Sequence, residues 1–222
     1  MTIKKNNKKT AAPLKVIKGA KAKVKTKAVT PSYTFLDLGC GENKSSVQSL
    51  FENGLITVEQ KDFSQVIGVD SQKVAGVDKV HDLTKFPYPF KDNSIDGAFS
   101  SHFLEHLDGE QRIKFFNEMY RILKPGAKMK HVHPYYKSSR AVQDPTHKFP
   151  SICEDSYLYW NKGWRDMNKL GHYLGDCNFE VESMVYTFMD QSWLTKNPEQ
   201  RDYAIKHYFN FVADLIVVQV KK

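Results

Sequence analysis

Aspartates follow three apolar, β-prone runs of the chain, and the first of them precedes a glycine turn. Asp37 stands two residues before Gly39-Cys40-Gly41, while Asp70 and Asp82 close two later runs. A strand that stops at two glycines and enters a helix lets backbone N–H groups approach a ligand closely. Carboxylates at the carboxyl ends of parallel strands can accept hydrogen bonds from ribose hydroxyls. This pattern predicts a site for a ribose-containing ligand, with Asp70 on the ribose.

These residues also have ordinary structural explanations. Gly-x-Gly turns occur without any ligand, and Asp70 could be an acid in a strand-end turn. A dinucleotide-binding fingerprint would need a third glycine at position 44, where the chain has Lys44. The glycine turn therefore needs the context of the other elements.

A second group of reactive side chains follows the apolar run at residues 128–132. It contains His133 and the segment Asp144-Pro145-Thr146-His147. Histidine is the usual general base near neutral pH. We therefore predict His147, and after it His133, as the base, with Asp144 as its orienting partner or as a ligand.

Structural alternatives remain open for this group as well. Asp144-Pro145 fits a turn with Asp at the first position and Pro at the second, and His131 fits a hydrogen-bonded core residue. His133, Asp144 and His147 could together bind a divalent metal ion, but their spacing matches no tight metal motif. We predict no metal site.

The elements that must position these residues alternate between β and α patterns. Strands are predicted at 33–38, 65–70, 77–83, 95–101, 128–132, 179–186 and 211–220, and helices at 45–53, 109–123, 151–160, 168–175 and 199–208. The chain has 222 residues, 41% of them hydrophobic, which suffices for one α/β domain with a substantial core. Tyr157, Tyr159, Trp160 and Trp164 could wall a substrate pocket, although such aromatic density more often belongs to a core.

The positive charge of the chain is concentrated at its N-terminus. The net charge is +8, yet residues 1–30 contain ten lysines and no acid, which leaves 23 basic and 25 acidic residues in 31–222. We expect 1–30 to be a disordered basic arm, either an electrostatic arm for nucleic acid or another polyanion, or a solvated tail. Residues 31–222 are then the folded domain.

The cysteines and the lengths of the apolar runs indicate the cellular compartment in which we expect the protein. Cys40, Cys153 and Cys177 show no C-x-x-C spacing, so we expect reduced thiols in a cytoplasmic protein. No apolar run approaches the ~20 residues needed to span a bilayer, and the N-terminus lacks the apolar block of a secretory signal. We expect no membrane association, and oligomeric state stays open.

Five segments, taken in order, resemble the class I S-adenosyl-L-methionine (SAM) dependent methyltransferases, and more narrowly the methyltransferase type 11 group. They are DLGCG (37–41), VIGVD (66–70), HDL (81–83), NSIDGAFSSHFLEHL (93–107) and RILKPGA (121–127). The resemblance covers roughly residues 33–136. It implies a Rossmann-like fold, a mostly parallel seven-stranded sheet flanked by helices, with the last strand antiparallel.

The resemblance also implies a SAM site. Its residues are Asp37, Gly39, Cys40 and Gly41 around the methionine end, Asp70 on the ribose, Asp82 and Leu83 at the adenine, and Ser101 and His102 beyond the fourth strand. Residues 144–147 resemble an Asp-Pro-Thr-His signature found after the fifth strand in a subset of type 11 enzymes, many of them in phages and bacteria.

Together these patterns predict methyl transfer from SAM to an oxygen or nitrogen acceptor, in a small molecule, a glycan, RNA or a protein side chain. DNA amino-methyltransferases are disfavoured because 100–103 reads Ser-Ser-His-Phe and not an Asn/Asp-Pro-Pro-Tyr loop. Cytosine-C5 enzymes are disfavoured because the chain has no Pro-Cys pair. The alternative is a non-catalytic SAM-fold protein that binds nucleic acid or another polyanion through its lysine-rich arm.

Overall fold

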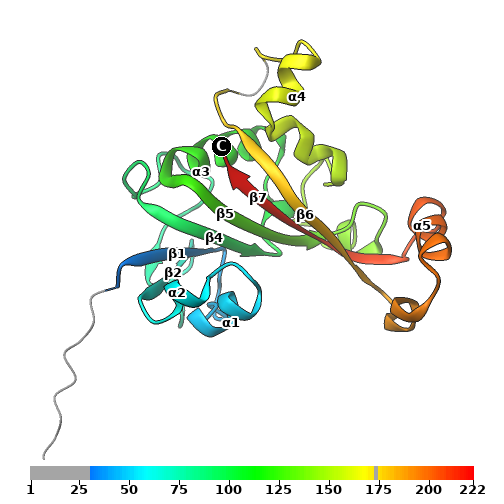
Figure 1. Cartoon of the computed structure of the whole chain (residues 1–222), viewed down its shortest axis with the longest axis horizontal. Helices are drawn as coiled ribbons and strands as arrows, with labels where there is room; N and C mark the ends of the chain where they lie inside the picture. Colours follow the sequence, from blue (N-terminus) through cyan, green and yellow to red (C-terminus); the bar gives the residue numbers. More distant parts are fainter. Residues whose placement is uncertain (1–30, 173–174) are drawn as a thin grey trace, which may run out of the picture.

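A single twisted sheet carries helices on both sides in the computed structural model, which describes residues 31–172 and 175–222 (Figure 1). The basic arm expected at residues 1–30 lies outside the described residues. The strands are β1 (Tyr33–Leu38), β2 (Ser64–Asp70), β3 (Lys79–Val80), β4 (Ile95–Ser101), β5 (Leu123–Pro134), β6 (Phe179–Phe188) and β7 (Val212–Lys221). The α-helices are α1 (Val47–Glu52), α2 (Val58–Lys61), α3 (Gly109–Ile122), α4 (Lys162–Met167) and α5 (Pro198–His207). Short 3₁₀ turns are η1 (Leu104–His106), η2 (Ser139–Ala141), η3 (Glu154–Trp160) and η4 (Gln191–Thr195).

The sheet has seven strands in the order β3-β2-β1-β4-β5-β7-β6. β1 to β5 pair in parallel, whereas β7 runs antiparallel to both β5 and β6. The predicted mostly parallel sheet with an antiparallel last strand is confirmed. The chain order reverses between β1 and β4, and open α/β sheets bind ligands beyond the carboxyl ends of the strands at such a point.

The alternation of side chains along β1 divides the core between the two faces of the sheet. Leu36 and Leu38 point to one face and belong to the same buried cluster as Phe116 of α3. Phe35 points to the other face, where it clusters with Leu50 of α1. All of these side chains are almost fully buried, and burial of each contributes about 1.5–3 kcal/mol.

α3 begins where the sequence places its cap. The Asp108 carboxylate accepts a hydrogen bond from the N–H of Gln111 (2.8 Å), and the Gln111 side chain accepts one from the N–H of Asp108 (3.0 Å). Such a reciprocal capping box stabilises a helix start by about 1 kcal/mol. It fixes η1, just before it, at the carboxyl edge of the sheet.

Several elements differ from the sequence expectations. The helix expected at 151–160 is the 3₁₀ turn η3, and the strand expected at 128–132 begins earlier, at Leu123. The helix expected at 168–175 lies earlier, as α4, because Asn161 caps it by accepting from the N–H of Trp164 (2.8 Å), and Asn168 is its C-cap. The third strand is reduced to Lys79–Val80. The segment between α1 and β2 contains the one-turn helix α2.

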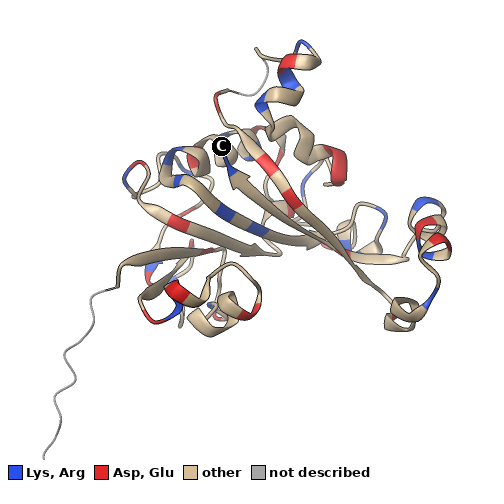
Figure 2. Ribbon diagram, viewed as in Figure 1, with Lys and Arg blue, Asp and Glu red and all other residues tan. Residues whose placement is uncertain are grey.

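Basic and acidic residues are interspersed along the described chain (Figure 2). An example is the ion pair between Lys128 of β5 and Glu182 of β6 (2.7 Å). None of the helices in residues 31–172 and 175–222 is both long and apolar enough to cross a membrane.

Candidate active site at the carboxyl edge of the sheet

The glycine turn after β1 has a shape that glycine makes possible. Gly39 and Gly41 have positive φ angles of 70° and 51°. Residues other than glycine adopt such angles only at a cost in free energy. A Cβ on Gly39 would also lie 2.8 Å from the ring of Phe103. The N–H groups of Gly39 and Cys40 both donate to the carbonyl of Val69. The turn therefore supplies close approach, while these two amides serve the β1–β2 pairing and are not free donors as the motif predicted.

Asp37 is a buried residue that organises the same turn. Its Oδ2 accepts a hydrogen bond from the N–H of Ser45 (2.6 Å), and burial raises the pKa of the Asp37 carboxyl. Cys40 is buried too, and a Cβ on Gly68 would lie 2.8 Å from its Sγ. Burial raises the pKa of the Cys40 thiol to about 11, so the side chain remains a thiol near neutral pH.

Two further carboxylates at strand ends are held by backbone N–H groups. Asp70 accepts from the N–H of Gly41 (3.0 Å) and from that of Gln72 (2.9 Å). Asp82 accepts from the hydroxyl (2.7 Å) and the N–H (2.9 Å) of Thr84, and these bonds lower the pKa of the Asp82 carboxyl. Both carboxylates are thus fixed in place at the rim of the cavity described next.

Two cavities open along this edge and meet at Gly39 and His102. One, of about 310 Å³, is lined by Gly39, Asp70, Ser71, Asp82, Leu83, Thr84, His102, Phe103, His106 and Leu107. The other, of about 420 Å³, is lined by Asp37, Gly39, Cys40, Asn43, Ser45, Phe99, Ser101 and His102. Eight of the nine residues that the sequence assigned to the cofactor line one or both cavities. Gly41 is adjacent, bonded to Asp70, and the space beside its Cα is open.

His102 stands where the two cavities join. Its φ of 53° lies in the left-handed region, which costs on the order of 1–3 kcal/mol for a residue other than glycine. The backbone is held there by its N–H, which donates to the carbonyl of Val132 (2.8 Å). Its Nδ1 lies 3.3 Å from Glu105 Oε1, and Glu105 raises the pKa of the His102 imidazole.

A third cavity, of about 220 Å³, continues from His102 toward the loop after β5. Its lining is His102, Glu105, His106, Pro134, Arg140, Gln143, Asp144 and His147. It shares His102 and His106 with the 310 Å³ cavity. The structure therefore places the Asp-Pro-Thr-His segment next to the predicted cofactor site, as the order of strands implied.

Residues 144–147 form the turn that the sequence left as an alternative. The N–H of His147 donates to the carbonyl of Asp144 (3.1 Å), and Asp144 Oδ1 accepts from the N–H and the hydroxyl of Thr146. The Asp144 carboxylate lies 3.9 Å from His147 Nε2, too far for a hydrogen bond. Asp144 therefore does not orient His147 directly. Its hydrogen bonds go to Thr146, whose hydroxyl contacts His106 Nδ1 (3.0 Å).

Arg112 of α3 attaches this loop to η1. Its buried guanidinium donates to the carbonyls of Leu104 (3.1 Å), Pro150 (2.5 Å) and Lys148 (3.3 Å). In addition, the N–H of Lys148 donates to the carbonyl of Glu105 (2.8 Å). These bonds fix His147 beside His106, and the two rings meet edge to face with centroids 4.9 Å apart.

The structure places His133, the second predicted base, in the core and not in the lining of these three cavities. The side chain is fully buried, with Nε2 2.8 Å from the Tyr157 hydroxyl and Nδ1 3.0 Å from the carbonyl of Pro134. Burial lowers the pKa of the His133 imidazole to about 4. On β5 its side chain points into the core, as does that of His131, whose Nδ1 contacts Ser100 Oγ (2.7 Å). The hypothetical metal set of His133, Asp144 and His147 is not brought together.

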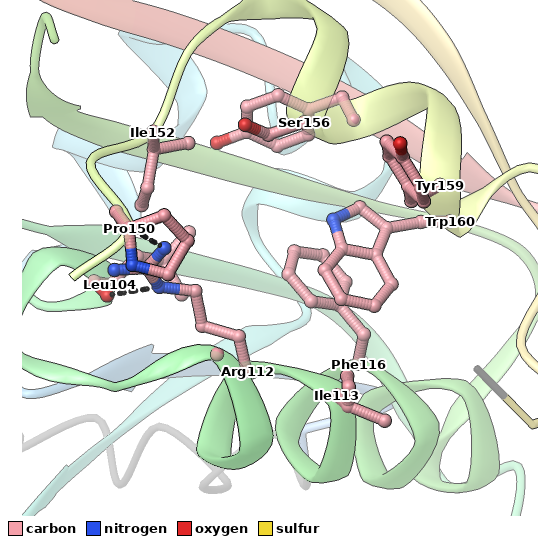
Figure 3. Close-up of a pocket in the computed structure, with 11 residues that line it drawn as sticks. Leu104, Arg112, Ile113, Phe116, Pro150, Ile152, Ser156, Tyr159 and Trp160 are labelled. Carbon is pink, nitrogen blue, oxygen red and sulfur yellow. Dashed lines mark hydrogen bonds between the residues drawn. The ribbon is translucent and has the colours of Figure 1, made fainter. Parts of the chain in front are cut away.

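An apolar cavity of about 210 Å³ lies on the other side of Arg112, between α3 and η3 (Figure 3). Trp160 stacks on Phe116 at 4.2 Å, and Tyr157 and Tyr159 contribute to the lining. Trp164 does not line it but packs against Tyr159 (4.9 Å). Tyr157 and Trp160 are core residues, as the structural explanation of the aromatic cluster predicts. The role of the cluster as a substrate pocket stays a prediction.

Three residues of this region were missed by the sequence analysis as functional candidates. Glu105 and His106 were noted only as part of a family segment, and Arg112 only as part of a helix. For Glu105 and His106 the signal is a pair of adjacent ionisable residues shortly after the end of β4, where ligands bind in parallel sheets. For Arg112 the sequence holds no such signal.

Comparison with known protein families gives one match over the first part of the domain. Residues 36–129 match the family described as a methyltransferase domain. A curated relative, the O-methyltransferase resE of Aspergillus sclerotiorum, is 31% identical over 99 residues. That match covers 42% of this chain and 37% of the relative, so the chain spans well under half of that protein.

Solved structures extend the likeness to most of the chain at the level of the fold. A SAM-dependent methyltransferase from Archaeoglobus fulgidus superimposes with a TM-score of 0.52 and 20% identity, over 85% of this chain and 86% of that one. The geranyl diphosphate C-methyltransferase of Streptomyces coelicolor A3(2), solved with S-adenosyl-L-homocysteine, gives a TM-score of 0.53 and 14% identity, over 87% and 75%.

Proposed function

We propose, from the premise that residues 36–129 form a class I SAM-dependent methyltransferase domain, that the protein transfers the methyl group of SAM to an oxygen or nitrogen acceptor. The observation that carries the proposal is the pair of cavities that meet at His102. Their lining combines a close-approach turn at Gly39 with fixed carboxylates at Asp70 and Asp82. Such a combination fits an adenosine linked to an amino-acid chain.

Each part of the lining has a role toward that ligand. Asp70 presents its carboxylate to the ribose hydroxyls, since a carboxylate oxygen that accepts one N–H bond has room for a second donor. Asp82 and Leu83 flank the adenine. The 420 Å³ cavity, with Asp37 and Ser101, takes the methionine end.

SAM supplies an electrophilic methyl group on a sulfonium, which is a good leaving group. The protein's contribution is then mainly alignment, exclusion of water and removal of one proton from the acceptor. The 220 Å³ cavity beyond His102 is the proposed acceptor site, because it adjoins both parts of the cofactor site. His147 serves it through Nε2, either as the proton acceptor or as a metal ligand.

The acceptor class is an oxygen or nitrogen nucleophile small enough, at its reacting end, for this cavity. The relative from Aspergillus is named an O-methyltransferase, which favours oxygen. The side chains around the cavity are polar or ionisable: His102, Glu105, His106, Arg140, Gln143, Asp144 and His147. A polar acceptor group fits this lining.

The direct test is calorimetry of the full-length chain with SAM and with S-adenosyl-L-homocysteine, followed by transfer of labelled methyl to a panel of hydroxyl and amine acceptors. We expect both cofactor forms to bind with one site per chain. Absence of binding by either form would contradict the proposal. Binding without transfer to any macromolecular or small acceptor would favour the non-catalytic alternative.

A second candidate function concerns the ten lysines of residues 1–30, which carry no compensating acid. We propose that this arm binds nucleic acid or another polyanion electrostatically. Deletion of residues 1–30 is expected to flatten the salt dependence of polyanion binding and to leave SAM affinity unchanged. An unchanged salt dependence would remove the arm from this role.

A further inference from the structure

We propose that Glu105, His106 and His147 form a binding site for one divalent transition-metal ion of the Zn²⁺ class. One potential ligand atom from each of these residues lies within 4.8 Å of the other two. Glu105 and His106 come from η1, and His147 comes from the turn that Arg112 holds against it. All three line the 220 Å³ cavity.

The carboxylate of Glu105 is the first sign of a missing partner. Its side chain is 8% exposed, and neither oxygen accepts a hydrogen bond from the residues that the structure describes. The 3.3 Å contact with His102 Nδ1 is an ion-pair distance without hydrogen-bond alignment. A buried carboxylate is costly unless it is paired, hydrogen-bonded or coordinated to a metal ion. A cation in the cavity would satisfy it.

The hydrogen bonds of Thr146 determine which nitrogen of His106 is free. Thr146 Oγ1 lies 2.7 Å from Asp144 Oδ1. Because a carboxylate can only accept, the Thr146 hydroxyl donates its proton to this hydrogen bond. The hydroxyl oxygen must then accept from Nδ1–H of His106 at 3.0 Å. In the neutral ring the lone pair therefore resides on Nε2, as a metal ligand requires.

The same reasoning applies to His147. Its Nδ1 lies 3.1 Å from the carbonyl oxygen of Ala141, which can only accept a hydrogen bond. The Nδ1 proton is thus fixed, and Nε2 carries the lone pair. Metal-binding histidines almost always donate their second ring N–H to a carbonyl, a carboxylate or a similar oxygen. Both histidines of the proposed site have this arrangement before any metal is considered.

The donor set selects the class of ion. Two imidazole nitrogens and one carboxylate suit zinc and its first-row neighbours, whereas Mg²⁺ and Ca²⁺ prefer all-oxygen ligands. Metal–ligand distances of ~2.0–2.2 Å place tetrahedral ligand atoms ~3.4 Å apart, so the three side chains would close slightly on binding. Three protein ligands leave one position open.

The charges around the cavity are mixed: two carboxylates, Glu105 and Asp144, line it with one guanidinium, and the buried Arg112 guanidinium also interacts with Glu105. Arg140 is the one guanidinium in the lining, and its Nε pairs with Asp214 at 3.1 Å. Asp144 Oδ2 adds a second carboxylate 3.9 Å from His147 Nε2. The open position faces a cavity that shares His102 and His106 with the cofactor site. A bound ion could activate an acceptor hydroxyl, and this role rests on the proposed function. The proposal that the site binds metal does not depend on that function.

The test is titration of the full-length, reduced chain with Co²⁺, followed by visible absorption, and with Zn²⁺ in competition with a chromophoric chelator. SAM is left out, so that the result does not depend on cofactor binding. We expect one ion per chain, with d–d bands and no thiolate charge-transfer band, because no cysteine is in the ligand set.

Three test variants and two matched controls distinguish this site from adventitious binding. Glu105→Gln and His147→Asn remove ligands and should each weaken Zn²⁺ binding by more than ~100-fold, beyond what outer-shell changes cause. Thr146→Val removes the exposed outer-shell hydroxyl without touching the core and should weaken it ~10–100-fold. The matched controls, Glu110→Gln on exposed α3 surface and His207→Gln on exposed α5 surface, should bind as the wild type does.

Three results would overturn the proposal. They are the absence of Co²⁺ binding, a thiolate charge-transfer band that places the ion at a cysteine, and equal affinity of Thr146→Val and the controls. A variant that fails to fold is recognised by circular dichroism, and Thr146→Val then decides. Loss of SAM binding with metal binding intact would contradict the proposed function alone.

Discussion

Carboxylates lie on both sides of His102, and they differ in their hydrogen-bond partners. Toward the glycine turn, Asp37, Asp70 and Asp82 all accept hydrogen bonds from backbone N–H groups of the loops at the strand ends. Toward the Asp-Pro-Thr-His turn, Glu105 is almost as buried as Asp37 but accepts no hydrogen bond from the described residues. The first set shapes loops around a ligand, whereas the second is positioned to bind one directly.

The two sides are also held together by different contacts. The glycine side is built by the parallel pairing of neighbouring strands and by local turns at their ends. The histidine side joins segments some 40 residues apart, and much of that joining falls to Arg112. Damage to one side should therefore leave the other intact.

The largest effect is expected from Arg112→Met, which breaks the histidine side. The change leaves the carbonyls of Leu104, Lys148 and Pro150 without their donor, and the unsatisfied carbonyl of the buried Leu104 alone costs about 1–3 kcal/mol. We expect the free energy of unfolding in urea to fall by at least that amount, with loss of Co²⁺ binding. SAM affinity should persist at temperatures where the variant is folded.

Lys114→Met on the same helix is the matched control. Lys114 is exposed and pairs only with Glu110 (2.6 Å), so its removal should change stability by less than about 0.5 kcal/mol. Equal stability of the two variants would show that Arg112 does not hold the loop.

A smaller effect, restricted to the glycine side, is expected from Asp70→Ala. Charged hydrogen bonds to the ribose contribute ~1.5–3 kcal/mol, so SAM affinity measured by calorimetry should fall ~10–100-fold. Co²⁺ binding should not change. Asp62→Ala, at an exposed position after α2, is the control. Unchanged SAM affinity in Asp70→Ala would remove Asp70 from the ribose site.

The smallest effect concerns the core between the two sides. Burial lowers the pKa of His131 to about 3 and that of His133 to about 4, below the ordinary ~6.5. Between these values the unfolded chain binds more protons than the folded one, so the free energy of unfolding should fall as the pH decreases from about 6.5. Removal of one such histidine should reduce this slope by ~1.4 kcal/mol per pH unit.

His131→Gln tests this, because glutamine can still hydrogen-bond Ser100 while it cannot titrate. Urea unfolding between pH 4.5 and 6 (about the range in which only the unfolded state is protonated) should give the shallower slope, and His207→Gln should match the wild type. An identical slope in both variants would mean that His131 is protonated in the fold.

The glycine side could be predicted from the sequence far better than the histidine side. The ends of strands carry Asp37, Gly39, Asp70 and Ser101. A strand end can be recognised from nearby sequence alone, because alternating apolar residues stop there and turn residues follow. Even there, the pattern suggested free amides at Gly39 and Cys40, because it cannot show that Val69 uses them.

The histidine side depends on contacts that no local pattern contains. His133 and His147 look alike in sequence, yet one points into the core from β5 and the other lines a cavity. Their difference arises from which face of β5 meets α3 and from where Arg112 attaches the following loop. Glu105 stands out only in the three-dimensional structure, where its buried carboxylate has no hydrogen-bond partner among the described residues.

The most direct test of the whole account is a crystal structure of the full-length chain with S-adenosyl-L-homocysteine. We expect the adenosine between Asp70 and Leu83 and the amino-acid chain in the cavity with Asp37 and Ser101. The sulfur should be directed past His102 toward Glu105, His106 and His147. A ligand bound instead in the apolar cavity beneath Trp160, or one whose sulfur faces away from His102, would contradict it.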